Sequence, residues 1–367
     1  MTAYLSPAFP GAVAFVVASL LVPPILWICT RLHIYDSPGP LKIHRVPIPR
    51  MGGVAIAVGV AISLALFPLS QRPAIPTWPF FAALALIWIA GLADDLRGLP
   101  PAVRIAAQAA AALLLWGAGW RLPLFTTGVA SIVALCLFII FFVNALNFLD
   151  GSDGLAAGVA CIIAIIYIAL PAGRESVFGR AVAWSLLGSC AGFLIFNLPP
   201  FAKIFMGDSG STLLGFVIAF LALDFFRANN SAPAATTVFF PSLVAALPLL
   251  DAALAILRRL LSSRTPLSGD RSHFYDLLLL RGWSPRKVLL TSLAISAALS
   301  LIATACLHCS FAQVVLISAS TLIALFVWIV RLGSLRAGEN SSQQIEEGKL
   351  RQKPLAHNPA RHSHQTT

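Results

Sequence analysis

The chain has 367 residues, of which 58% are hydrophobic and only 11% are charged, and its formal net charge is +11. The mean hydropathy is +0.87. A soluble protein of this length needs far more charge to cover its surface, so the composition excludes a water-soluble globular domain. It indicates a polytopic membrane protein.

Long apolar segments recur along most of the chain. A helix needs about 20 apolar residues to cross the hydrocarbon core of a bilayer, and the alternating pattern of a membrane β-barrel is absent from the sequence. We therefore predict an all-α fold with about eleven transmembrane helices. The predicted spans are 8–30, 52–70, 78–93, 102–119, 128–149, 155–171, 181–198, 211–226, 236–257, 288–307 and 311–332.

Lys and Arg gather in the loops on one side of these spans, whereas the loops on the other side hold few. Because positive residues are retained in the cytoplasm, we predict that the N-terminus lies outside and the C-terminus inside. Residues 1–332 then form a transmembrane domain, and the polar, basic segment 333–367 forms a disordered cytoplasmic tail. The predicted cytoplasmic loops are 31–51, 93–101, 150–154, 199–210 and 258–287.

Most Asp residues fall in the same cytoplasmic loops or at the adjoining ends of spans. Asp94 and Asp95 are adjacent and would repel each other unless a cation or a proton intervenes. The stretch from Asn144 to Asp153 carries two Asn and two Asp at three-residue intervals. Polar contacts between membrane helices usually need only one such group, so this stretch favours a functional role.

Groups suited to phosphate lie in three other cytoplasmic segments. Asp208 stands in G-D-S-G-S-T at the start of a predicted helix, where free N–H groups and hydroxyl caps favour an anion, although a plain N-cap explains the pattern equally well. The basic side chains of the first and longest loops include Lys42, His44, Arg45, Arg271 and His273.

Acidic and basic groups on one membrane face favour an anion-plus-metal site over ordinary solvated loops. A secondary transporter is the rival class, but its coupling acids gather near the middle of the membrane.

Five motifs occur in order between the spans: D-x-P-x-x-x-K-x-H-x-x-P-x-P-R-x-G-G, G-x-x-D-D, N-x-x-N-x-x-D-G-x-D-G-L, F-M-G-D-S-G-S and R-S-H-x-Y. This series, across roughly residues 8–307, resembles the polyprenyl-phosphate N-acetylhexosamine-1-phosphate transferases of glycosyltransferase family 4. The resemblance implies a bacterial inner-membrane enzyme that transfers an N-acetylhexosamine 1-phosphate from a UDP-sugar to undecaprenyl phosphate at the cytoplasmic face, releasing UMP. It also implies Mg²⁺, with Mn²⁺ as a substitute, a homodimer as one option, and no nucleic-acid partner.

The resemblance assigns roles to the residues at matching positions. The catalytic residues are Asp94, Asp95 and Asp208, of which Asp208 and Asp95 bind the metal. The nucleotide-sugar is bound by Asn147, Asp150, Asp153, Phe205, Lys42, His44 and Arg45. The sugar or diphosphate loop contains Arg271 and His273. A single His in R-S-H-F-Y is more similar to the O-antigen-initiating branch than to the phospho-N-acetylmuramoyl-pentapeptide transferase, which stays the alternative.

Overall fold

The structure, a computed structural model, describes residues 8–37, 46–67, 77–200, 202–229, 234–263, 265 and 271–335. In these ranges the chain forms thirteen helices and one two-stranded antiparallel sheet. The helices are α1 (Phe9–Arg31), α2 (Gly52–Ala65), α3 (Trp78–Arg97), α4 (Pro101–Gly117), α5 (Gly128–Leu149), α6 (Leu155–Ile168), α7 (Val177–Asn197), α8 (Asp208–Ala228), α9 (Ala234–Val244), α10 (Ala246–Leu261), α11 (Phe274–Leu280), α12 (Pro285–Cys306) and α13 (Phe311–Arg331); the strands are β1 (Tyr35–Asp36) and β2 (Ile48–Pro49).

Each predicted span corresponds to a helix or, in one case, to a bent pair of helices. Among the described residues, seven helices are long and apolar enough to cross a membrane, and the bent pair raises this number to eight. Helices α2, α4 and α6 are apolar but have only 14, 17 and 14 residues. The all-helical, polytopic membrane fold is therefore confirmed, while eleven crossings and the orientation of the termini stay predictions.

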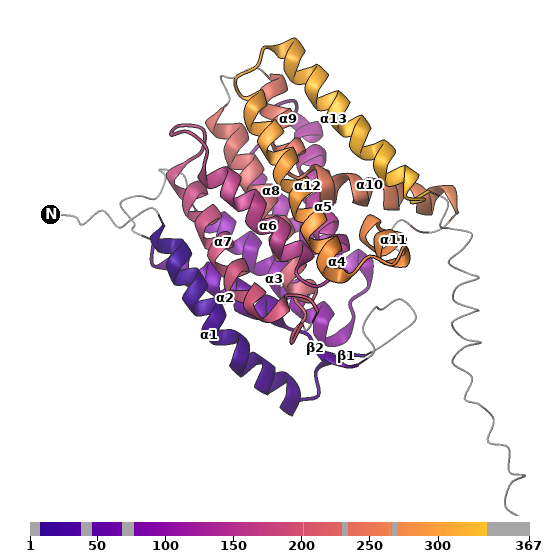
Figure 1. Ribbon diagram of the computed structural model, residues 1–367. Coiled ribbons are helices and arrows are strands. Elements are labelled where there is room, and N and C mark those ends of the chain that lie inside the picture. The colour runs from indigo at the N-terminus through magenta and orange to yellow at the C-terminus, as the bar shows by residue number, and fades with distance from the viewer. Residues whose placement is uncertain are drawn as a thin grey trace, which may run out of the picture.

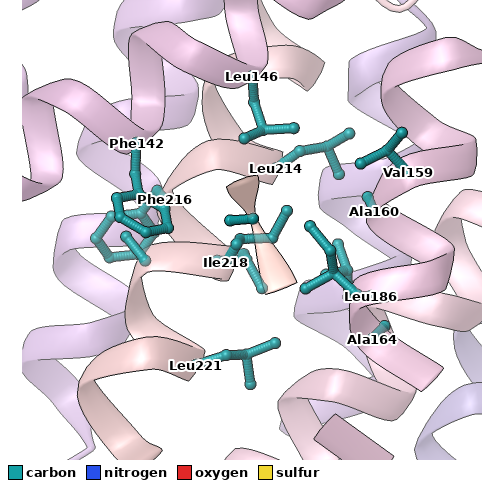
Figure 2. Close-up of a cluster of buried hydrophobic side chains, with 14 of the residues drawn as sticks. Phe142, Leu146, Val159, Ala160, Ala164, Leu186, Leu214, Phe216, Ile218 and Leu221 are labelled. Carbon is teal, nitrogen blue, oxygen red and sulfur yellow. The ribbon is translucent and has the colours of Figure 1, made fainter. Parts of the chain in front are cut away.

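Helix α8 lies at the centre of the bundle and packs against α2, α3, α5, α6, α7 and α9. Its apolar window is 100% buried, whereas that of α13 is 22% buried. A helix that is apolar on all sides must be surrounded by other helices. Figure 2 shows Leu214, Ile218 and Leu221 of α8 among side chains of α5, α6 and α7. This packing fixes the position of the first residue of α8, Asp208.

The peripheral helices present large apolar side chains outwards. Helices α1 and α13 lie at opposite flanks of the bundle in Figure 1. Leu20 of α1 and Leu316 of α13 are both 68% exposed. Surfaces of this kind promote association in water, but in a bilayer they contact lipid.

The predicted single span 236–257 is two helices, α9 and α10, which are bent by 80° where they meet. Pro248 lies in the first turn of α10 and has no N–H to donate to the carbonyl of Val244, and its ring would clash with that group. The helix therefore restarts in a new direction. It also continues beyond the predicted end, so Arg258 and Arg259 lie on α10 and not in the following loop.

Asp224 has no role in any of the sequence motifs. It lies near the end of α8 remote from Asp208, where it is 3% exposed. Its carboxylate accepts hydrogen bonds from the backbone N–H of Ser176 at 2.8 Å and from the hydroxyl of Ser176 at 2.7 Å. Asp224 therefore attaches the segment before α7 to the central helix.

Glu175, in the same segment, should make the stability of the protein depend on pH. It is 7% exposed, and its Oε1 lies 2.7 Å from Nε of Arg180. Burial outweighs the effect of Arg180 and raises the pKa of Glu175 from 4.5 to about 8. The folded state therefore binds this proton more tightly than the unfolded state, and the free energy of unfolding rises as the pH falls from 8 towards 4.5.

Glu175→Gln, which imitates the protonated carboxyl, should raise Tm in detergent above pH 8 and lose this advantage as the pH falls towards 4.5. The measurement is the difference in Tm between variant and wild type across this range. A difference that does not change with pH would contradict the raised pKa.

Candidate active site

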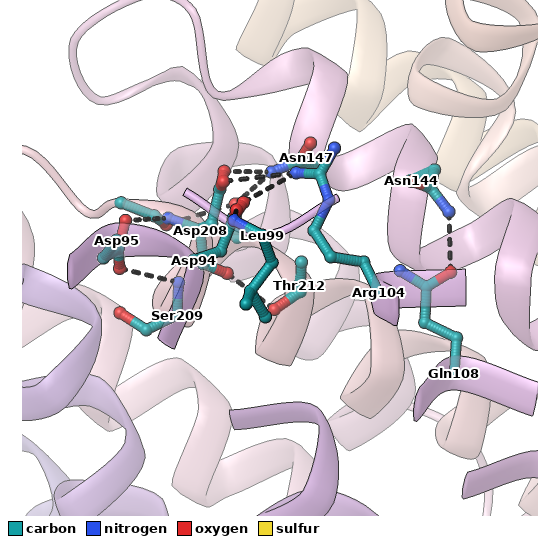
Figure 3. A network of polar contacts seen from close by, with 12 residues as sticks. Asp94, Asp95, Leu99, Arg104, Gln108, Asn144, Asn147, Asp208, Ser209 and Thr212 are labelled. Atoms are coloured by element: carbon teal, nitrogen blue, oxygen red, sulfur yellow. Dashed lines mark hydrogen bonds and ion pairs between the residues drawn. The ribbon is translucent and has the colours of Figure 1, made fainter. Parts of the chain in front are cut away.

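Four predicted site residues form one polar network at one end of the bundle, as Figure 3 shows. Asp94 and Asp95 lie in the last turn of α3, Asn147 lies in the last turn of α5, and Asp208 is the first residue of α8. The side chains converge because α3 and α5 both pack along the central helix. Segments more than 100 residues apart in sequence thus meet at one site.

The Asp208 carboxylate is contacted on both oxygens. Nδ2 of Asn147 donates to Oδ1 at 2.6 Å, and Nη1 of Arg104 lies 3.3 Å from Oδ2. The same Nδ2 also lies 3.0 Å from Oγ of Ser211. Because 33% of the Asp208 side chain remains exposed, this is a carboxylate that a ligand can reach.

Arg104 joins Asp94 to Asp208, and the sequence motifs did not identify it as a site residue. Its Nη1 lies 2.8 Å from Oδ2 of Asp94, whose Oδ1 accepts from the N–H of Leu99. One guanidinium thereby stabilises two carboxylates that would otherwise repel each other. Arg104 could have been recognised from the sequence by its position in the first turn of α4, the helix that follows the aspartate pair.

Asp95 points away from its neighbour and caps helix α8. Its Oδ1 accepts from the N–H of Asp208 at 2.8 Å, and its Oδ2 accepts from the N–H of Ser209 at 3.0 Å. The first N–H groups of a helix have no partner within it, and the helix dipole favours a negative charge there. The expected hydroxyl caps do not form, because Ser211 and Thr212 donate to carbonyls one turn earlier.

Gly91 allows α3 to approach α8 closely beside this network. A Cβ atom at Gly91 would lie 2.7 Å from the carbonyl oxygen of Asp208 and 2.8 Å from Oγ1 of Thr212. Gly91→Ala should therefore displace the aspartate pair and lower the rate of the transfer that the motifs imply by about tenfold or more, since a displacement of about 1 Å can cost about a hundredfold. Gly117→Ala in α4 is the matched control, because its Cβ would meet nothing within 4 Å. Equal rates in the two variants would contradict the close approach.

The chain bends after Asp150, because α5 ends at the preceding residue and α6 starts only after a turn that contains Asp153. Burial raises the pKa of Asp150 well above its usual value, and the negative charges of Asp208, Asp95 and Asp153 raise it further. The carboxyl groups at this end of the bundle therefore repel one another, and a bound cation would relieve that repulsion.

Asn144 does not join the network of Asp208. Its Nδ2 donates to Oε1 of Gln108 in α4 at 2.8 Å, at one side of the view in Figure 3. Asn144 therefore connects α5 to α4, whereas Asn147 connects α5 to the site residue Asp208.

Phe205 lies beside the described part of the first loop. Its N–H donates to the carbonyl of Pro49 at 2.8 Å, and its carbonyl accepts from the N–H of Gly52 at 2.9 Å. Arg50 donates to the carbonyl oxygen of Asp95. The first loop is thus attached to the chain that leads into α8. Outside the described residues lie three predicted site residues: Lys42, His44 and Arg45.

His273 lies next to the end of α5, and Arg271 contacts the first turn of α11. The His273 and Phe148 ring centroids are 5.7 Å apart, and the hydroxyl of Tyr275 donates to the carbonyl of Phe148 at 3.0 Å. Nε of Arg271 lies 3.7 Å from Oδ1 of Asp276. The loop before α11 is thereby attached to the helix that carries Asn147.

Known proteins resemble the chain over most of its length. The family model of glycosyl transferase family 4 matches residues 77–226. The probable undecaprenyl-phosphate N-acetylglucosaminyl 1-phosphate transferase of Bacillus subtilis is 30% identical over 292 residues, which are 75% of this chain and 78% of that protein. The decaprenyl-phosphate N-acetylglucosaminephosphotransferase of Mycobacterium tuberculosis is 33% identical over 318 residues, with 77% and 78% covered.

The phospho-N-acetylmuramoyl-pentapeptide-transferase of Moorella thermoacetica is 33% identical over 254 residues, but these are only 58% of this chain and 74% of that protein. The match with the N-acetylglucosamine enzymes is longer, and it confirms the family indicated by the motifs. The chain belongs to glycosyl transferase family 4, among the polyprenyl-phosphate N-acetylhexosamine-1-phosphate transferases.

Proposed function

We propose that the chain transfers N-acetylglucosamine 1-phosphate from UDP-N-acetylglucosamine to undecaprenyl phosphate, with release of UMP, as the first membrane step of a cell-envelope polysaccharide. The observation that carries this proposal is the partly exposed Asp208 carboxylate, joined to Asp94 through Arg104. Two carboxylates and a guanidinium in this arrangement are suited to bind a diphosphate together with a cation. The names of the relatives support both the sugar and the polyprenyl phosphate.

In this reaction an oxygen of the lipid phosphate attacks the β-phosphorus of the donor and forms a new P–O bond. The bond from that phosphorus to the oxygen shared with the α-phosphate breaks, and its electron pair leaves with UMP. A phosphate monoester is largely dianionic near neutral pH because its second pKa is about 6. Little general-base help is needed, so positioning and charge neutralisation by groups such as Arg104 dominate.

The carboxylates fit Mg²⁺. This ion is usually bound through one or two carboxylates, while water and substrate phosphates complete its coordination. Within the described ranges, no three His, Cys, Asp or Glu side chains form a metal site by themselves. Asp208 and Asp94 would bind the ion, and Asp95 would fix Asp208 instead of binding the ion itself. Bound Mg²⁺ supplies charge neutralisation of the diphosphate.

The donor is tested with membranes that contain the protein, undecaprenyl phosphate and Mg²⁺, and with a panel of UDP-sugars. We expect a lipid-linked N-acetylglucosamine diphosphate from UDP-N-acetylglucosamine, identified by mass spectrometry, and no product from UDP-N-acetylmuramoyl-pentapeptide. The reverse result would favour the pentapeptide transferase, and no product from any sugar would reopen the transporter alternative. Membranes with the Asp208→Asn variant are the control for background activity.

A further inference from the structure

Asp251 is a buried carboxylate in an apolar helix, and none of the sequence motifs assigns it a role. It lies in α10 and is 2% exposed. An ionisable side chain in such surroundings is costly unless its oxygens find partners. The partners of the Asp251 carboxylate should therefore explain why an Asp occupies this position.

Both oxygens of Asp251 bind the start of the short helix α11. Oδ2 lies 2.6 Å from Nδ1 of His273, and Oδ1 accepts a hydrogen bond from the N–H of Phe274 at 3.0 Å. A carboxylate that only capped the helix would need the backbone contact alone. The second contact instead determines how the imidazole ring is oriented.

The plane of the His273 ring is fixed from a second direction. The ring of Tyr275 is parallel to it within 3°, with centroids 5.5 Å apart. The hydroxyl of Tyr275 is bound to the carbonyl of Phe148 in the last turn of α5. Asn147, which binds Asp208, lies in the same turn. His273 is thus positioned relative to the helix end that also supports the carboxylate network.

A carboxylate at one imidazole nitrogen determines the use of the other. His273 is 4% exposed. When Asp251 accepts at Nδ1, that nitrogen carries a hydrogen in both the neutral and the charged ring, so a contact between the ring nitrogens and a substrate has to be made through Nε2. Carboxylates that orient a working histidine in this way are frequent in active sites. We propose that Asp251 is a positioning residue for the transfer reaction, which holds His273 so that Nε2 faces the sugar-diphosphate part of the donor.

This role rests on the proposed function and is tested by a double-mutant cycle of Asp251→Asn and His273→Ala. If Asp251 acts through His273, Asp251→Asn should lower kcat/KM for UDP-N-acetylglucosamine by about tenfold or more in the wild-type background. It should have no further effect once His273 is absent. The same double-mutant cycle is repeated with the Kd of UDP-N-acetylglucosamine as the measured quantity, because donor binding requires no turnover.

Asp224→Asn is the matched control. Asp224 is a carboxylate of similar burial that likewise accepts from a backbone N–H, but it lies at the remote end of α8. This variant should leave kcat/KM unchanged in both backgrounds, and Tm of every variant reports any general loss of folding. An equal fold-loss from Asp251→Asn with and without His273 would overturn the positioning role. An inactive wild type in the same series would instead contradict the proposed function.

Discussion

Asp208→Asn is expected to lower the rate of UMP release by about a hundredfold to a thousandfold, while the protein still folds. Asparagine keeps the shape of the side chain and an oxygen that accepts from Asn147, but it removes the charge that attracts Arg104 and would bind Mg²⁺. Losing one electrostatic group of an active site typically has an effect of about this size. The measurement is the initial rate of UMP release in proteoliposomes, with Tm as the test of folding.

The control for this variant is Asp224→Asn on the same helix, which removes a carboxylate far from the site. Residues 208 and 224 are about 24 Å apart along a helix that rises about 1.5 Å per residue. We expect Asp224→Asn to change Tm and not the rate. A folded Asp208→Asn protein with substantial activity would contradict the role of Asp208.

Removal of divalent cations is the second large effect that we expect. With EDTA the transfer should stop, and added Mg²⁺ or Mn²⁺ should restore it, because acids at the site and phosphates of both substrates repel each other without a cation. The rate of UMP release is measured at increasing concentrations of Mg²⁺. Full activity in EDTA would exclude the proposed metal.

The same titration separates the roles of the two adjacent aspartates. Asp94→Asn should need more Mg²⁺ for half-maximal activity, because Asp94 would bind the ion together with Asp208. Asp95→Asn should lower Tm with little change in this concentration, since Asp95 binds backbone N–H groups of α8. The opposite pattern would make Asp95 the ligand, as the motifs suggested.

The apolar segments of the sequence predicted the helices well, since each corresponds to a single helix except the segment that forms α9 and α10. The bend between α9 and α10 could have been recognised from Pro248, whose effect on a helix is local. The sequence also predicted that Asp94, Asn147 and Asp208 lie near one another, because all three stand at the same end of the predicted spans. These features depend on hydrophobic length and on side-chain type, which a sequence displays directly.

Side-chain directions could not be predicted in this way. Asp94 and Asp95 are adjacent, yet one binds Arg104 and the other caps α8, because the rotation of α3 about its axis is set by packing on α8. Asp251 has its partner 22 residues away, across a loop whose path no local pattern encodes. Arg104 and Asp251 therefore acquired roles only from the three-dimensional arrangement.

The identity of the nucleotide that leaves tests the central claim most directly. Purified protein in proteoliposomes with UDP-N-acetylglucosamine, undecaprenyl phosphate and Mg²⁺ should release UMP, in an amount equal to the lipid-linked sugar diphosphate that forms, and none when the lipid phosphate is omitted. Release of UDP would mean that the sugar is transferred without its phosphate. That result would contradict the assignment of the site to phosphoryl transfer.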